Sequence, residues 1–501
     1  MSESWKIFHG IFMSKYIVFA LIAILILFGL PYFSKFFPTK ECSQLTGNVV
    51  LKDDANYDKA RLVSNFYTSK NRFPKAIVYA QNSKDVQNAI RWARCNNVQV
   101  RIRSGGHHHE GYSTGTDALV IDVSQMKEIQ LDKENQIATI QPGLNNLELY
   151  TILNKNGFTH VGGTCSEVGL SGLVLSGGIG PLVRRVGLTC DTLISVDIVD
   201  ANANIITATK DNEYKDLFWA TCGGGGGNFG VITSMKIKVF PTSDVTWFNI
   251  GWDWDQPMDE IIAAWQDFFE QPDRNWFSHL DLWAKSFPEE ELKKQPIKVL
   301  GVFFGSQEDA KKQLEPLLNI GTPASTVIES VTWDKAIQNI EASTAVFLTE
   351  KPEYKSTGAF AMEKLPEDAV RKLYEALKTS PSPLLNVLLF SMSGATADIA
   401  PTDTAYFYRQ AKFFINYSSQ WLKEEEDKKH KTELTALRQQ LLPYTVGDYI
   451  GNPDPELKDY MKEYYGENAT RLQCVKRKYD PENFFHFEQS IPPATADQKC
   501  E

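Results

Sequence analysis

A glycine-rich loop with three consecutive histidines is the clearest chemical signal in the first part of the chain. Residues 101–113 read RIRSGGHHHEGYS and follow an alternating apolar stretch at 98–102 that predicts a strand. Glycines permit positive φ and let neighbouring backbone N–H groups converge on an anion such as a pyrophosphate. The residues alone allow phosphate binding, a plain turn, or a metal patch at His107, His108 and His109. Alternating side chains would point His108 away from its neighbours, which disfavours the metal.

Two further glycine-rich segments lie downstream. Residues 162–180 read GGTCSEVGLSGLVLSGGIG, and residues 222–231 read CGGGGGNFGV. Glycine at this density among apolar residues predicts backbone packed closely against a large flat ligand. The alternative is a tightly packed loop with a buried structural cysteine at Cys165. Five consecutive glycines that lead into a strand do not fit a flexible linker between two elements of structure.

The elements that position these loops form an α+β pattern. Hydrophobic periodicity predicts a helix at 83–97 and strands at 118–123, 137–141, 193–199 and 231–239. After Pro241 the sequence pattern changes: predicted strands such as 298–304 and 385–390 alternate with long amphipathic helices up to about residue 442. With 501 residues, the chain is expected to fold as two domains, the second being a sheet covered by helices.

Composition and the N-terminus indicate the compartment. A net charge of -10 argues against a nucleic-acid partner. The apolar stretch at 17–30 predicts a signal anchor, with a cleaved signal or a buried helix as alternatives, so we expect a membrane-bound protein with a lumenal or extracellular catalytic region, or a secreted one. Seven cysteines leave at least one without a cysteine partner in this chain. Sequons at Asn416 and Asn468 are candidate glycosylation sites.

Taken together, the motifs RSGGH…EGYS, GGTCSEVG, GGGGGNFGV and the ending YYGENATRL…DPENFF…EQSIPP occur in a characteristic order. This ordered set resembles the berberine bridge enzyme-like branch of the vanillyl-alcohol oxidase superfamily of FAD-linked oxidases. The resemblance implies an α+β fold with a two-part PCMH-type FAD-binding domain (70–242) and an α/β substrate domain with an antiparallel sheet covered by helices (243–445). A C-terminal segment (446–493) returns to the FAD domain, and residues 1–40 form the anchor and its juxtamembrane segment.

The resemblance also implies roles for particular residues. His107 matches the histidine that joins the flavin 8α-methyl group, and Cys165 matches the cysteine that forms a second bond, to C6. Val168 matches a valine that permits reaction of the flavin with O₂ in family members. Cys42 and Cys95 match two cysteines that form a disulfide in secreted members. No metal is expected. The remaining residues that we expect to bind the cofactor are Arg103, Ser104, Gly105, Gly106, His108, Gly111, Tyr112, Gly169, Gly172, Gly177, Gly178 and Val231.

Departures from the family pattern affect the chemistry. Leu173 stands where members usually have a histidine near the flavin pyrimidine edge. Asn452 stands where the family places a tyrosine assigned to the catalytic base, and an amide accepts no proton at useful pH. Tyr449 and Tyr408 are the candidate catalytic residues, by neighbourhood alone.

The expected activity is therefore that of an FAD-linked oxidoreductase, with covalently bound FAD as its cofactor. Family analogy predicts oxidation of a carbohydrate or alcohol C–H bond, with O₂ as electron acceptor and H₂O₂ as product. The partners are then a small-molecule substrate and O₂. One alternative is a flavin-loaded module that has lost catalysis, which Leu173 and Asn452 motivate. Another is a dehydrogenase that passes electrons to a partner.

Overall fold

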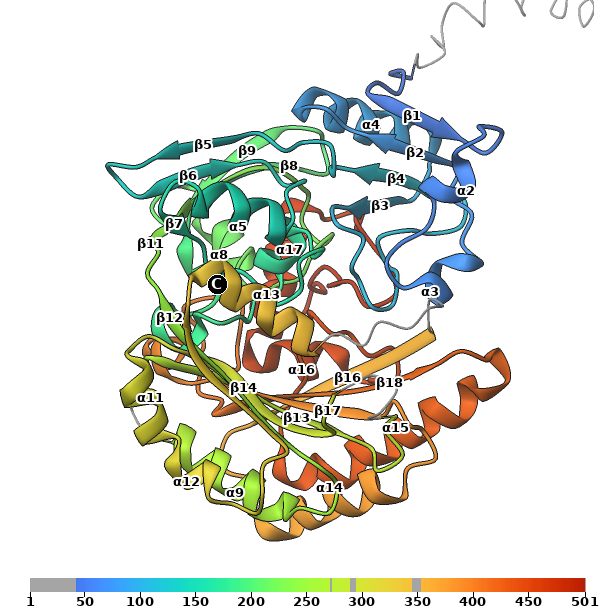
Figure 1. The fold of residues 1–501 in the computed structure, drawn as a ribbon. Helices are drawn as coiled ribbons and strands as arrows, with labels where there is room; N and C mark the ends of the chain where they lie inside the picture. Colours follow the sequence, from blue (N-terminus) through green and yellow to red (C-terminus); the bar gives the residue numbers. More distant parts are fainter. Residues whose placement is uncertain (1–41, 271–272, 289–293, 345–352, 501) are drawn as a thin grey trace, which may run out of the picture.

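The computed structural model describes residues 42–270, 273–288, 294–344 and 353–500 (Figure 1). The predicted signal anchor lies outside these residues. Within the described part of the chain, no helix is both long enough and apolar enough to cross a membrane.

The first sheet has four strands in the order β1 (Asn48–Leu51), β2 (Ala76–Tyr79), β4 (Leu119–Asp122) and β3 (Val100–Arg103). β2, β4 and β3 are parallel, and helix α4 (Ser83–Asn96) makes the crossover from β2 to β3. Its buried residues Val86, Ala89, Ile90 and Ala93 recur at helical spacing, as predicted. Short helices α2 (Tyr57–Ala60) and α3 (Phe66–Lys70) lie between β1 and β2 in the sequence.

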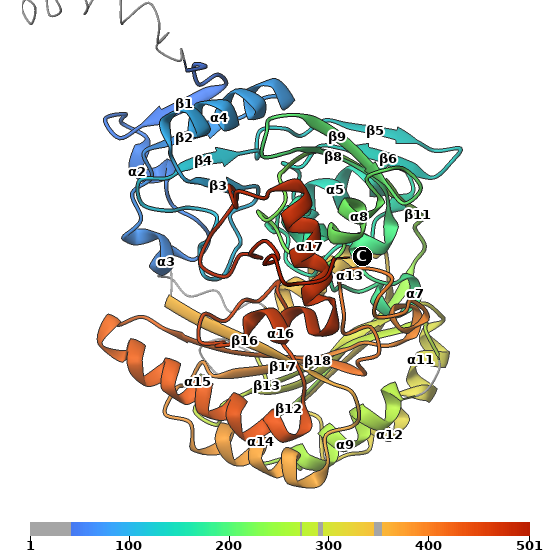
Figure 2. The same ribbon diagram turned by 180° about the vertical axis from the view of Figure 1, so that it is seen from behind.

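The second sheet is antiparallel, in the order β5 (Ile129–Asp132), β6 (Ile137–Ile140), β10 (Val231–Lys238), β8 (Leu193–Val199) and β9 (Ile205–Thr209). A two-stranded ribbon pairs β7 (Phe158–Thr159) with β11 (Phe240–Pro241). The connections between these strands hold the short helices α5 (Asn146–Asn154), α6 (Leu170–Leu175), α7 (Val183–Val186) and α8 (Lys215–Ala220), of which α6 lies within the second glycine-rich segment. The C-terminal helix α17 (Ala469–Tyr479) packs against α8, as Figure 2 shows, so the end of the chain joins this part of the molecule.

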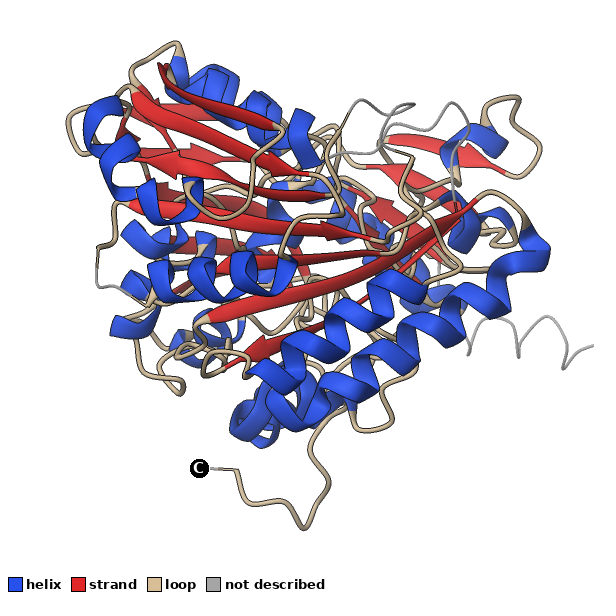
Figure 3. Ribbon diagram, turned by 60° about the horizontal axis from the view of Figure 1, so that its bottom comes forward, coloured by secondary structure: helices blue, strands red, loops and turns tan. Residues whose placement is uncertain are grey.

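The third sheet has seven strands, all antiparallel, and forms a separate layer. Their order is β15 (Ser325–Val331), β12 (Val245–Trp252), β14 (Ile297–Phe303), β13 (Trp276–Trp283), β17 (Asn386–Ser391), β18 (Phe413–Trp421) and β16 (Glu353–Ala361). Its outer face is covered by α9 (Met258–Phe269), α11 (Gln307–Gln313), α12 (Glu315–Leu318), α14 (Glu367–Thr379) and α15 (Asp427–Leu441) (Figures 1 and 3). Its inner face is turned toward the first two sheets, with α13 (Trp333–Thr344) and α16 (Tyr460–Tyr465) between the layers. The predicted fold class is thus confirmed.

Strand alternation decides which side chains reach each face of this sheet. On β13, Trp276, Leu280 and Leu282 join the apolar core under the helices. The intervening residues, including His279 and Trp283, therefore point to the inner face. Every residue of β13 is buried, so the polar ones are enclosed between two layers.

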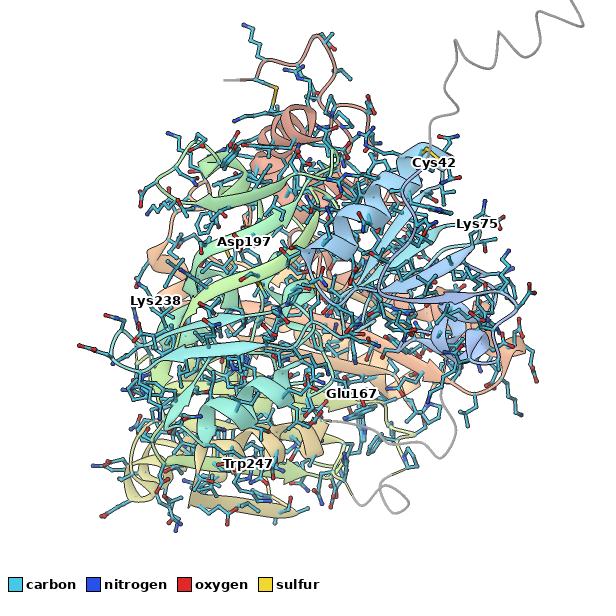
Figure 4. All side chains as sticks on the ribbon, turned by 90° about the horizontal axis from the view of Figure 1, so that it is seen from above. Cys42, Lys75, Glu167, Asp197, Lys238 and Trp247 are labelled. Carbon is cyan, nitrogen blue, oxygen red and sulfur yellow. A yellow bond between two sulfur atoms is a disulfide. The ribbon has the colours of Figure 1, made fainter. Side chains whose placement is uncertain are left out.

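Three disulfides brace the molecule. Cys42–Cys95 ties the first described residue to α4, as predicted from the resemblance (Figure 4). Cys190–Cys222 joins the 3₁₀ turn Thr189–Thr192 to the start of the five-glycine run, and Cys474–Cys500 fastens the C-terminal tail to α17. Cys165 is the free cysteine of the described chain.

Candidate cofactor and substrate site

A cavity of about 480 Å³ lies between the glycine-rich loops and the inner face of the seven-stranded sheet. All three glycine-rich segments contribute to its wall, although they are far apart in the sequence. The sequence-predicted residues that line it are Ser104, Gly105, Gly106, His107, His108, Tyr112, Cys165, Val168, Gly169, Gly172, Leu173, Tyr449 and Asn452.

The loop after β3 has the geometry of an anion site. Gly106 has φ +68°, a conformation that L side chains rarely adopt. The consecutive N–H groups of residues 105–108 donate to no acceptor among the described residues. Ser113, at the end of the same segment, lines the cavity and its Oγ also has no partner within the described chain. Consecutive backbone donors without a partner, in a loop that lines a cavity, favour phosphate binding over a plain turn.

Close contact between two loops explains part of the glycine pattern. A Cβ on Gly169 would lie 2.4 Å from the backbone nitrogen of Gly105, and a Cβ on Gly105 would lie 2.5 Å from that of Gly169. Gly172, in contrast, has no atom within 4 Å of the Cβ position, although it lines the cavity. The first two glycines therefore allow the loops to pack, whereas the third leaves a flat wall for a ligand.

His107 and Cys165 come from different loops and line the same cavity. His107 Nε2 lies 3.3 Å from Ser64 Oγ and 3.9 Å from Glu167 Oε2, and burial lowers the pKa of its imidazole (Glu167 is labelled in Figure 4). The Cys165 side chain is exposed to the cavity, while burial and then the charge of Glu341 raise its pKa. Near neutral pH both groups are therefore uncharged.

His108 and His109 line the cavity, but a protein group engages Nδ1 of each ring. His108 Nδ1 accepts the N–H of Glu110 at 3.2 Å, and its ring packs 4.7 Å from that of Tyr112. His109 Nδ1 shares a hydrogen bond with Ser356 Oγ on β16. Burial lowers the pKa of both imidazoles to about 3. No candidate metal cluster in the described chain includes these histidines, and the one close group, Cys190, Asp191 and Cys222, has its two thiols joined as a disulfide.

Five predicted cofactor residues support the site without lining it. Arg103 forms a buried ion pair with Asp122 at the ends of β3 and β4. Gly111, Gly177 and Gly178 have positive φ and pack on neighbouring side chains, so they shape the loops. Val231 is completely buried in β10.

The two catalytic candidates differ in position. Tyr449 lines the cavity, its hydroxyl accepts the N–H of Gly178 at 3.2 Å, and burial raises its pKa to about 12. Tyr408 does not line it: its hydroxyl donates to the carbonyl of Glu463 at 2.7 Å and its ring stacks on Phe360. The structure therefore does not support Tyr408 as a catalytic residue, since its phenol is already engaged in packing.

The sheet supplies a wall that the sequence did not single out. His279, Trp283 and Asn386 come from β13 and β17, and alternate residues of β18 add Asn416, Ser418 and Gln420. From α13, Glu341 accepts the N–H of Ser166 at 2.8 Å and lines the cavity beside Cys165. The alternation in FFINYSSQW, residues 413–421, was the only sequence signal for these positions.

The structure does not support the two sequons as glycosylation sites. Asn416 faces the cavity from within β18. Asn468 is 3% exposed, and its Nδ2 donates to the carbonyls of Pro401 and Thr404. Neither amide presents the exposed surface that a glycan needs.

Comparison with known proteins identifies the class. Residues 74–209 match the model of an FAD binding domain, and residues 448–492 match the berberine and berberine like model. An uncharacterized FAD-linked oxidoreductase of Bacillus subtilis (strain 168), YgaK, is 38% identical over 457 residues, which cover 90% of this chain and 98% of that one. The chain belongs to the berberine bridge enzyme-like family of FAD-linked oxidoreductases.

Solved structures share the fold over nearly the whole chain. BBE-like 1 of Physcomitrella patens has a TM-score of 0.82 at 22% identity, covering 92% of this chain and 100% of its own. A chitooligosaccharide oxidase has a TM-score of 0.80 at 23% identity, covering 91% of this chain and 100% of its own. The residues of the cavity fit FAD. The N–H groups of residues 105–108 can donate to a pyrophosphate, and Gly172 leaves room for a flat ring because it has no side chain.

Proposed function

We propose that this protein is a carbohydrate or alcohol oxidase that carries its FAD covalently, on His107 and through a second bond on Cys165. One observation carries the proposal: these two side chains reach the same cavity from separate loops. Cys165 is also the described cysteine that takes no part in the three disulfides. The uncharged imidazole of His107 has a free electron pair for bond formation, in keeping with its lowered pKa.

The opposite wall supports an uncharged, hydroxylated substrate. Amide and hydroxyl side chains from β17 and β18 line it, and no lysine or arginine of the described sheet does so. The chitooligosaccharide oxidase with the same fold is, by its name, active on a carbohydrate. The proposed reaction converts an alcohol carbon to a carbonyl while O₂ becomes H₂O₂, so that two electrons and two protons are balanced.

The bound flavin would supply the two-electron acceptor, and the chain would hold the substrate against it. The Tyr449 phenol stays protonated through the physiological range, so it serves as a hydrogen-bond donor to a substrate oxygen. The Asn452 amide serves the same purpose. Val168 lines the cavity at the position where the resemblance implies access for O₂.

Acid precipitation of the purified protein tests the covalent link. Flavin colour that stays with the washed pellet supports it, and colour that passes to the supernatant contradicts it. His107→Ala and Cys165→Ala then separate the two bonds: each single variant keeps the colour on the remaining bond, and the double variant releases it.

Anaerobic addition of sugars and alcohols tests the reaction. Bleaching of the flavin followed by stoichiometric peroxide on exposure to air supports an oxidase. Bleaching with faster turnover on an artificial acceptor than on O₂ indicates a dehydrogenase. A bound flavin that no compound of a broad panel reduces would indicate a flavin-loaded module without catalysis.

Three disulfides also support our proposal that the protein works in an oxidising compartment. Quantitative thiol labelling of the protein from its native source tests this. We expect no more than one free thiol per chain under denaturing conditions, and none if Cys165 is bonded to flavin.

A further inference from the structure

Two buried polar side chains on β13 have no hydrogen-bond partner in the described chain. His279 is completely buried, and neither of its ring nitrogens has a partner. Trp283 is 3% exposed, and its indole Nε1 has none. Both line the cavity. Buried polar groups in folded proteins are nearly always satisfied, so two unsatisfied groups in one cavity wall indicate a ligand that completes them.

Asp281, which lies between them on the same face of β13, is paired with a buried cation. Asp281 pairs with Lys298 at 2.8 Å and accepts the side-chain N–H of Asn386 at 2.6 Å. This buried pair adds no net charge behind the cavity wall. It also leaves His279 and Trp283 as separate contact points, four residues or about 13 Å apart along the strand.

The chemistry of each contact point follows from its surroundings. His279 lies between the rings of Phe277 and Phe390, with centroid distances of 4.8 and 4.2 Å. Burial, assisted by Lys298, lowers its pKa to about 3, so the ring is neutral and offers one donor and one acceptor. Trp283 offers a donor only, beside an aromatic face.

We propose that His279 and Trp283 are specificity-determining residues that hydrogen-bond one extended, uncharged, hydroxyl-rich substrate at two points along β13. The proposal rests on the function proposed above, in which a hydroxylated compound reduces the flavin. A single sugar ring is too short to bridge the two points, so longer sugars bind better. A carboxylated sugar binds worse, because no cation of the sheet faces the cavity within the described chain.

Anaerobic flavin reduction by glucose, cellobiose, cellotriose and glucuronate tests this on the flavin-loaded protein. We expect apparent affinity to rise from glucose to cellotriose and to be weakest for glucuronate. His279→Phe raises the half-saturating concentration of each neutral sugar roughly tenfold, with a much smaller change in the limiting rate. Trp283→Phe, which removes the N–H and keeps a ring, raises it for cellotriose but not for glucose.

Matched variants control for packing. His430→Phe changes a buried histidine on α15, where its ring stacks on Trp421 at 5.1 Å behind the sheet. Trp254→Phe removes another indole N–H without a partner in the described chain, away from the cavity. Both should leave every half-saturating concentration unchanged. If His279→Phe does not fold, His279→Asn and His279→Leu repeat the comparison at similar volume, and only the asparagine variant should retain the affinity.

In one outcome, sugars reduce the flavin normally while His279→Phe and Trp283→Phe leave every half-saturating concentration unchanged. That result would overturn the inference but not the proposed function. If no sugar reduces the wild-type flavin, the proposed function fails, and binding is read instead from the shift of the flavin spectrum on titration with cellotriose. A smaller spectral shift, or one that needs more cellotriose, in His279→Phe supports the two contact points. An unchanged shift, or none in the wild type, overturns them.

Discussion

The two walls of the cavity are built on different principles. The wall formed by the glycine-rich loops is shaped mainly by backbone: free N–H groups, positive φ, and glycines at which a Cβ would collide with the next loop. The side chains of His107 and Cys165 complete it. The wall formed by the seven-stranded sheet consists of side chains on alternate strand positions, held over a buried ion pair. A backbone wall suits one invariant ligand, whereas a side-chain wall can be changed residue by residue without refolding the sheet.

The broadest expected effect comes from the backbone wall, because one substitution there should lower both stability and flavin content. Gly169→Ala places a methyl group 2.4 Å from both the backbone nitrogen of Gly105 and Ser104 Oγ, so the backbone of the facing loop must shift. We expect a loss of about 3 kcal/mol or more, as in severe overpacking, and little flavin-loaded protein. Thermal unfolding and the flavin-to-protein absorbance ratio measure both effects.

Gly172→Ala is the matched control, because its Cβ meets no atom within 4 Å and α6 favours alanine by about 0.5–1 kcal/mol. This variant should fold with an unchanged or higher melting temperature, and its flavin content reports on the flat wall alone. If both variants behaved alike, the loop contact between Gly105 and Gly169 would not be what the first variant disturbs.

A substitution behind the side-chain wall should lower the stability of the protein without lowering its flavin content. Lys298→Met leaves the carboxylate of Asp281, which is 1% exposed, without its partner. Removing one member of a buried pair costs about 3–5 kcal/mol. Denaturant unfolding should show this loss while the flavin content of the folded protein stays at the wild-type level.

The double variant Lys298→Met, Asp281→Asn removes both charges and keeps an acceptor for Asn386. It should recover more than half of the lost stability. Equal losses in the single and double variants would show that packing around Lys298, rather than the charge left on Asp281, matters.

Acid should lower the free energy of unfolding through buried histidines of both walls. His108, His109 and His160 on the loop side and His279 on the sheet have pKa values lowered by burial to about 3. The unfolded chain titrates near 6.5, so it binds more protons and stability falls as pH drops below about 6.5, by up to about 1.4 kcal/mol per pH unit for each histidine.

One carboxyl acts in the opposite direction. Burial raises the pKa of Asp448 to about 8, so between about 4 and 8 the folded state holds a proton that the unfolded state does not, and this term lowers stability as pH rises. Stability should therefore be greatest near pH 6.5. Unfolding free energies from pH 4.5 to 8 test this, and Asp448→Asn should flatten the alkaline side and steepen the acid side. A maximum that did not move toward the alkaline side in that variant would contradict the assignment.

The same contrast explains what sequence reasoning could find. The residues of the backbone wall occur in contiguous sequence motifs. Gly105, Cys165 and Val168 could therefore be predicted, and they line the cavity. The side-chain wall comes from strands that are distant in the sequence, and each contributes only alternate residues. His279 on β13 therefore looked like any other buried strand residue.

Two other expectations from the sequence find no support in the structure, because sequence letters do not show which way a side chain points. Tyr408 stands next to Arg409, whose guanidinium pairs with Asp191 at 2.7 Å, and both side chains are buried away from the cavity. The sequon at Asn468 has the right letters, but its side chain is buried against a loop 64 residues earlier in the chain. Only the folded chain shows which way these side chains point.

Tyr449 is the residue at which the two walls meet, and the smallest predicted effect concerns it. Its hydroxyl accepts the N–H of Gly178 from the glycine-rich segment, and its ring packs 5.3 Å from Phe414 on β18. Tyr449→Phe keeps the ring and removes one hydrogen bond, so we expect a loss of about 1 kcal/mol in stability and a fall of a few-fold in the rate of flavin reduction. The pH profile of that rate should not change below about pH 10, because the pKa of this phenol is raised to about 12. A much larger fall, with loss of an ionisation from the profile, would instead make Tyr449 the proton acceptor and place the catalytic base at the junction of the two walls.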